Sequence, residues 1–186
     1  RLIIAGLVMS AVWAHFGAWA QVTIHSLSAS KKFARHSPLL VCTTTGKFLA
    51  SNILGGVLQC LISLLIGLIP PTSVGWYAML VKAHVLFMFN GCLAIILAMI
   101  GPEIGKSLSA SQMKVWALTM QLGTFMNGAA HLKGAISGTK CSFIRSMGKA
   151  PHGEDPVMEG MLMFCGVNIV IAMALTVLGL HKRIKA

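Results

Sequence analysis

Residues 83–105 read AHVLFMFNGCLAIILAMIGPEIG, a long apolar run that contains two uncharged polar side chains, His84 and Asn90. A later stretch, residues 123–131, reads GTFMNGAAH and sets Asn127 and His131 four positions apart. Imidazole and amide groups placed in lipid or in a protein interior cost free energy unless they have hydrogen-bond partners or ligands. These two stretches therefore decide both the class of fold and the place of the candidate site.

The composition is that of an integral membrane protein. Of the 186 residues, 56% are hydrophobic and 10% are charged, whereas roughly 25% of the residues in a soluble domain are charged. The net charge of +11 comes from basic residues at the ends of apolar runs, without interleaved aromatics that would stack on bases. We therefore expect a lipid bilayer as the partner and no nucleic acid.

Five apolar runs predict an all-α helical bundle of about five transmembrane helices, forming a single domain over residues 1–186. About 20 helical residues cover the hydrocarbon core of a bilayer. The runs are residues 2–20 (extending less clearly to 27), 48–69, 76–100, 115–136 and 158–180. Pro70 and Pro71 are expected to end the second helix, and Gly101 with Pro102 the third. For residues 2–27, lying flat in the membrane interface is the alternative to spanning.

The basic residues predict the orientation. If five spans alternate, one membrane face carries the C-terminus and nine basic residues: Lys31, Lys32, Arg35, Lys47, Lys106, Lys114, Lys182, Arg183 and Lys185. Acidic residues offset the basic ones on the other face. The positive-inside rule then places the C-terminus on the cytoplasmic, matrix or stromal side. An organellar membrane such as the mitochondrial inner membrane is one expected location.

His84 and His131 form a candidate pair of metal ligands. In neighbouring antiparallel helices they lie about 12 Å and about 8 Å from the same membrane face, at 1.5 Å per residue. Histidine is a common axial ligand of haem iron, and an apolar shell suits the porphyrin. Asn127 shares the helix face of His131, while Asn90 is rotated by about 120° from His84. Each asparagine could bond a bound oxygen or hold a ligating histidine, and hydrogen bonding between helices is the alternative for both histidines.

A family resemblance rests on Trp76, Ala83-His84, Asn90-Gly91, Pro102 and Gly105, followed by Gly123 and Asn127. With the spacing His-x5-Asn-Gly-x10-Pro-x2-Gly, residues 46–182 resemble styrene oxide isomerase. The resemblance implies a four-span membrane enzyme that binds haem b between the subunits of a trimer. Its ferric iron acts as a Lewis acid that opens an epoxide into an aldehyde. Carried over, His84 is the axial ligand and Asn90 lies beside the open face of the iron.

The chain departs from that family at two places. His131 stands where the family has a tyrosine, so it could either occupy the sixth coordination site or replace the tyrosine as a catalytic polar partner. The run at residues 2–27 has no counterpart and could cover a neighbouring subunit. The alternative function is therefore a non-catalytic accessory subunit of a larger organellar or bacterial energy-converting complex.

A third hypothesis is a small transporter or quinone-site protein with a polar path through the membrane. Its residues would be Asn52, Gln59, Gln121 and Asn168. The sequence contains no paired-carboxylate site, P-loop or GxGxxG motif, which leaves hydrolase and NTPase functions without support.

Overall fold

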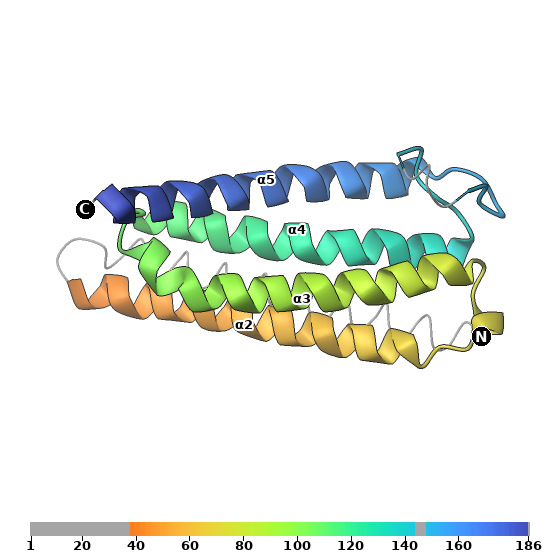
Figure 1. Cartoon of the computed structure of the whole chain (residues 1–186), viewed down its shortest axis with the longest axis horizontal. Coiled ribbons are helices and arrows are strands. Elements are labelled where there is room, and N and C mark those ends of the chain that lie inside the picture. The colour runs from red at the N-terminus through yellow and green to blue at the C-terminus, as the bar shows by residue number, and fades with distance from the viewer. Residues whose placement is uncertain (1–37, 144–147, 186) are drawn as a thin grey trace.

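The structure is a computed structural model that describes residues 38–143 and 148–185. These residues form the long helices α2 (Pro38–Gly67), α3 (Tyr77–Gly105), α4 (Ala110–Ser137) and α5 (Pro156–Lys185). The helices lie side by side (Figure 1). A short 3-10 helix, η1 (Pro71–Ser73), connects α2 to α3. No strand occurs within these two described ranges, so the predicted all-α class is confirmed. The expected first helix, residues 2–27, lies outside the described residues.

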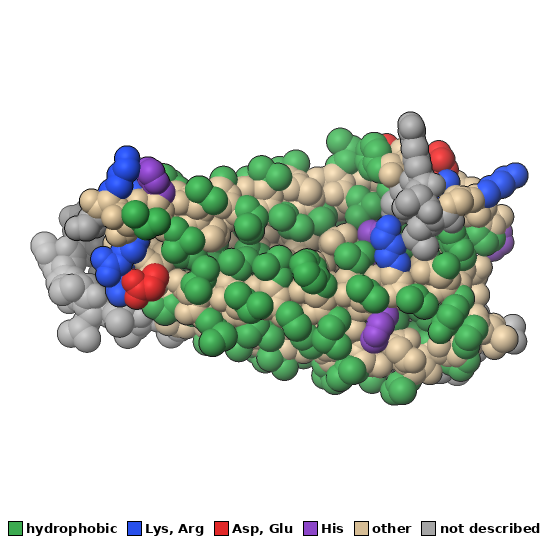
Figure 2. Space-filling model, viewed as in Figure 1, with side chains coloured by type: hydrophobic (Ala, Val, Ile, Leu, Met, Phe, Trp, Pro, Cys, Tyr) green, Lys and Arg blue, Asp and Glu red, His purple; other side chains and the backbone are tan. Residues whose placement is uncertain are grey.

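Three described helices are long and apolar enough to cross a membrane: residues Phe48–Gly67 of α2, all of α3 and all of α5. Figure 2 shows hydrophobic side chains covering the visible face of the bundle, with most charged side chains near its two ends. Helix α4 has 28 residues but carries Gln121, Asn127, His131 and Lys133. It contacts all three other described helices, which buries Gln121 and His131 and leaves Asn127 and Lys133 half-buried. The expected count of about five spans is not confirmed.

Helix α3 continues beyond the point where the sequence predicted its end. Pro102 lies inside the helix, which reaches Gly105. Proline removes one backbone hydrogen bond, but tertiary contacts hold the last turn. Ile104 is fully buried against Gly179 of α5. A Cβ added to Gly179 would lie 2.7 Å from the Cγ2 atom of Ile104. The prediction that Gly101 and Pro102 end this helix is therefore wrong, whereas α2 does end before Pro70.

Local signals define the ends of α4. The Ser109 side chain accepts a hydrogen bond from the backbone N–H of Gln112, and the Gln112 side chain accepts one from the backbone of Ser109. This reciprocal capping box fixes the first turn. Gly138 ends the helix with a φ of 69°, a left-handed conformation that glycine adopts without strain.

Helices α2 and α3 approach each other closely at Gly56 and Gly91. A Cβ at Gly56 would lie 2.7 Å from the carbonyl oxygen of Gly91, and a Cβ at Gly91 would lie 2.6 Å from that of Gly56. Small residues allow such backbone contact in membrane bundles. The absence of a side chain at both positions therefore lets the two helix backbones touch.

Two apolar clusters fill the interior of the bundle. One surrounds Phe87 and Phe125, whose ring centroids lie 5.7 Å apart, and the other surrounds Trp116 and Ile104. Along α4, the buried polar residues Gln121 and Thr124 lie between them. This polar layer links the fold to the candidate site.

Candidate functional site

His84 is held at the interface between α2 and α3 by Ser63. The Nδ1 atom of His84 lies 2.8 Å from the carbonyl oxygen of Ser63, and the Ser63 hydroxyl donates to the carbonyl oxygen of His84 at 2.6 Å. A Cβ at Gly67, one turn after Ser63, would lie 3.3 Å from the Cε1 atom of the imidazole. The small side chains at positions 63 and 67 therefore make space for the ring.

These contacts select one tautomer of His84. A carbonyl oxygen only accepts hydrogen bonds, so Nδ1 must carry the proton and donate it to Ser63. The Nε2 atom is then the unprotonated nitrogen, and it has no hydrogen-bond partner among the described residues. A histidine that ligates a metal usually has this arrangement, with the other ring nitrogen bonded to a carbonyl or carboxylate. The side chain is half-buried, so it is not sealed inside the bundle.

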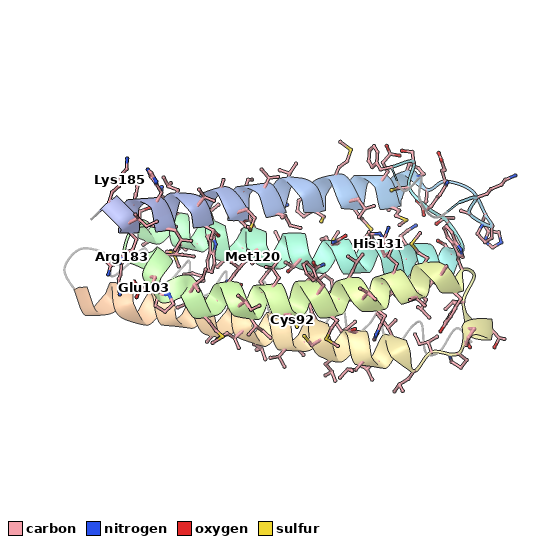
Figure 3. All side chains as sticks on the ribbon, viewed as in Figure 1. Cys92, Glu103, Met120, His131, Arg183 and Lys185 are labelled. Carbon is pink, nitrogen blue, oxygen red and sulfur yellow. The ribbon has the colours of Figure 1, made fainter. Side chains whose placement is uncertain are left out.

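His131 lies in the interior of the bundle on α4, where Figure 3 labels it. Its side chain is 4% exposed, and its Nδ1 atom lies 2.8 Å from the carbonyl oxygen of Asn127, one turn earlier. The Nε2 atom is buried and has no hydrogen-bond partner. We expected His84 and His131 to meet between α3 and α4. The His84 ring bonds Ser63 of α2, and His131 bonds its own helix, so the joint ligation of one metal by the two histidines stays a prediction.

Asn90 and Asn127 differ in their surroundings. Asn90 is 3% exposed, and its Nδ2 atom donates to the carbonyl oxygen of Thr124 on α4 at 2.9 Å. This contact joins α3 to α4, a role that the sequence did not indicate for Asn90. The Asn127 side chain is half-buried and makes no hydrogen bond to a described residue. Its predicted contribution to cofactor binding stays a prediction, as does the catalytic role of Asn90.

The polar residues of the transporter hypothesis lie mostly together. Gln59 donates to the Thr124 hydroxyl at 3.1 Å, and Gln121 donates to the Asn52 carbonyl oxygen at 3.1 Å. Asn168 instead bonds the carbonyl oxygen of Phe164 on its own helix. Asn52, Gln59 and Gln121 therefore belong to one polar layer between α2 and α4. Asn168 makes no hydrogen bond to this layer.

An ion pair lies at the end of the bundle next to the loop before α5. Lys133 of α4 forms an ion pair with Asp155. The other carboxylate oxygen of Asp155 accepts from the backbone N–H of Val157 at 2.9 Å. The hydrogen bond from Lys133, together with those from the backbone N–H groups of Val157 and Met158, holds the pKa of Asp155 below its ordinary value.

Comparison with known proteins identifies the family. The profile of the styrene oxide isomerase family matches residues 37–181, which include α2, α3, α4 and all but the last turn of α5. The chain belongs to the styrene oxide isomerase family. No match was found among curated proteins or among solved structures.

Family membership agrees with the predicted resemblance and with a bundle of apolar helices. It adds no evidence on the cofactor, the assembly or the compartment, so haem b, a trimer or larger complex, and a mitochondrial location stay predictions. Within residues 38–143 and 148–185, no three His, Cys, Asp or Glu side chains come together as metal ligands. A haem group needs no such cluster, because its porphyrin supplies four of the ligands to iron.

Sequence reasoning missed Ser63 and Gly67. Both are small residues set one turn apart in an apolar run, which in a membrane helix is a signal for close packing against a neighbour. That signal could have indicated the α2–α3 contact. It could not have shown that His84 was the residue accommodated there.

Proposed function

We propose that this member of the styrene oxide isomerase family is a membrane haem-b protein that isomerises epoxides, with His84 as the axial ligand. The observation that carries the proposal is the state of the His84 ring. Its Nδ1 atom is bonded to the carbonyl oxygen of Ser63 at 2.8 Å, which leaves the Nε2 lone pair available for iron. A half-buried position suits a ligand that must reach a large flat group.

The residues beside His84 fit the same proposal. Val81 and Val85 on α3 are exposed and apolar, and one turn further on lies Met88. Such side chains suit the faces of a porphyrin. When bound, the ferric haem supplies a Lewis acid to polarise the epoxide oxygen. The chain itself would hold the haem through His84, and Ser63 fixes the orientation of the His84 imidazole.

An absorbance spectrum of the purified full chain tests haem binding. We expect a Soret band in the wild type that is lost in His84→Ala, because the axial ligand is gone. The matched control is His152→Ala, which removes an exposed histidine from the loop before α5 and should keep the band. A colourless wild-type protein, even after haem is added, would contradict the proposal.

A second measurement separates one histidine ligand from two. Since His84 turns towards α2 while His131 bonds its own helix, we expect a single axial histidine and an open position for substrate. His131→Tyr, which restores the residue of the family, should then leave the oxidised spectrum high-spin as in the wild type. A low-spin wild type that becomes high-spin in His131→Tyr would show instead that both histidines ligate the iron.

Turnover of an aryl epoxide to the aldehyde, without reductant, tests the enzymatic part. We expect activity in the wild type and in His152→Ala, and none in His84→Ala. A haem-loaded wild type that leaves the epoxide unchanged would leave haem binding intact and refute the isomerase function.

A further inference from the structure

A shallow groove runs along one face of α5, away from His84 and His131. Its volume is about 620 Å³, and His181 lies at its end. The other lining side chains are all apolar: Ile169, Val170, Met173, Ala174, Val177 and Leu178. Val170 and Val177 are 67% and 64% exposed, so the described helices leave this face uncovered. We call it the α5 groove.

The groove has the length of one leaflet of a bilayer. From Ile169 to His181 the helix rises roughly 18 Å, at 1.5 Å per residue. Half of the hydrocarbon core of a bilayer is roughly 15 Å thick. An acyl chain that lies along the α5 groove therefore reaches the level of His181 with its headgroup end.

Basic side chains continue the groove beyond its apolar part. Lys185 follows His181 by four residues, so the two share the face of α5 that carries the groove. Arg183 lies on the opposite face, where its Nε atom is 3.1 Å from a carboxylate oxygen of Glu103. Figure 3 shows Arg183 beside Glu103 and Lys185 apart from that pair. Arg183 is thus engaged by an acid, whereas Lys185 extends the groove.

We propose that the α5 groove binds an anionic phospholipid, with an acyl chain along Val170–Leu178 and the phosphate between His181 and Lys185. The charge at the end of the groove distinguishes this occupant from others. A zwitterionic lipid would bring its own cation to a basic site. A second copy of the chain, placed with the same end beside this one, would oppose Lys182 and Lys185 with equal positive charge. Basic side chains at a helix end are a recurrent feature of anionic lipid sites.

Native mass spectrometry of the full chain in detergent tests the proposal, with phosphatidylglycerol and phosphatidylcholine titrated separately. We expect phosphatidylglycerol to bind the wild type more tightly. Lys185→Gln should weaken phosphatidylglycerol binding roughly fivefold, the effect of about one basic residue near a charged lipid surface, and leave phosphatidylcholine unchanged. Ala174→Trp, which fills the middle of the groove, should weaken both.

Arg183→Gln is the matched control. It removes one positive charge two residues from Lys185, but on the face that pairs with Glu103. We expect it to bind phosphatidylglycerol within twofold of the wild type. Thermal unfolding without lipid checks that each variant is folded, and the exposed Lys185→Gln change carries the test if Ala174→Trp fails that check.

Three results would overturn the proposal. Equal binding of phosphatidylglycerol and phosphatidylcholine would show that the headgroup charge does not determine which lipid the groove binds. A loss in Arg183→Gln as large as that in Lys185→Gln would mean that overall charge, and no defined site, attracts the lipid. Disulfide cross-linking of an Ala174→Cys variant to a second copy in membranes would show that protein covers the groove. None of these results depends on whether the chain binds haem.

Discussion

The two candidate histidines bond through the same ring nitrogen but to different partners. In both, Nδ1 donates to a carbonyl oxygen at 2.8 Å, that of Ser63 on another helix for His84 and that of Asn127 on the same helix for His131. The remaining Nε2 atom is buried in His131 but belongs to a half-buried side chain in His84. A large planar ligand can therefore reach His84 with less disturbance of packing than His131.

The Asp155 carboxylate should make the stability of the fold depend on pH. Its pKa lies below the ordinary value, chiefly because of the hydrogen bond from Lys133. A lowered pKa in the folded protein means that the carboxylate stabilises the fold above the ordinary Asp pKa of about 3.9. This contribution is lost as the pH falls from about 4 towards the lower pKa of the folded state. Thermal unfolding measured between pH 7 and pH 3 should show the loss in the wild type.

Substitution separates the charge of Asp155 from its role at the start of α5. Asp155→Asn should flatten the pH dependence below about pH 4, because it removes the titrating carboxylate. Asp155→Ala should additionally cost about 1 kcal/mol at neutral pH, since the backbone donors of Val157 and Met158 lose their acceptor. Glu154→Gln, a neighbouring acid whose side chain makes no ion pair with a described residue, is the control. A wild-type pH dependence in Asp155→Asn would contradict the assignment.

At the scale of elements, backbone contact between α2 and α3 sets the position of Ser63 against His84. The contact is possible because Gly56 and Gly91 have no Cβ atoms, and Cys60 lies beside Gly91. Gly101 likewise leaves room for Leu49 of α2. The interface that orients the proposed ligand thus depends on glycines at some distance from it.

Gly56→Ala should destabilise the bundle by about 1–3 kcal/mol, because the new Cβ would lie 2.7 Å from the carbonyl oxygen of Gly91. Gly166→Ala on α5 is the matched control, since no atom lies within 4 Å of a Cβ at that position. It should leave stability unchanged or raise it, because alanine favours helix over glycine. Thermal unfolding in detergent measures both. Equal effects of the two substitutions would show that the close contact does not contribute to stability.

Across the whole molecule, the buried polar layer ties three helices together between two apolar clusters. Thr124 of α4 accepts from Gln59 of α2 through its hydroxyl and from Asn90 of α3 through its carbonyl oxygen. Both Gln59 and Thr124 are fully buried. The Oε1 atom of Gln59 has no hydrogen-bond partner, so the layer is not fully satisfied. Such a layer defines which helices pair at the cost of some stability.

Thr124→Val should lower stability by about 1–3 kcal/mol, because it leaves the buried Nε2 donor of Gln59 without its acceptor. Adding Gln59→Leu should recover much of the loss, since the double variant has neither the donor nor the unpartnered Oε1 atom. Chemical or thermal unfolding of the two variants and the wild type provides the measurement. A double variant less stable than Thr124→Val would show that the amide has another partner.

The sequence by itself determined the membrane class, the all-α fold, the family and the approximate places of α3, α4 and α5, whereas α2 begins at Pro38, ten residues before the predicted run. It could do so because hydropathy is a local property and because the motif around His84 and Asn90 keeps a fixed spacing. Only the tertiary structure decided that α3 continues through Pro102, that His84 turns towards Ser63 and that Asn90 bonds Thr124 on α4. Those features depend on how one helix is rotated against another, and this rotation is set by contacts such as that between Gly56 and Gly91, which join residues far apart in the chain.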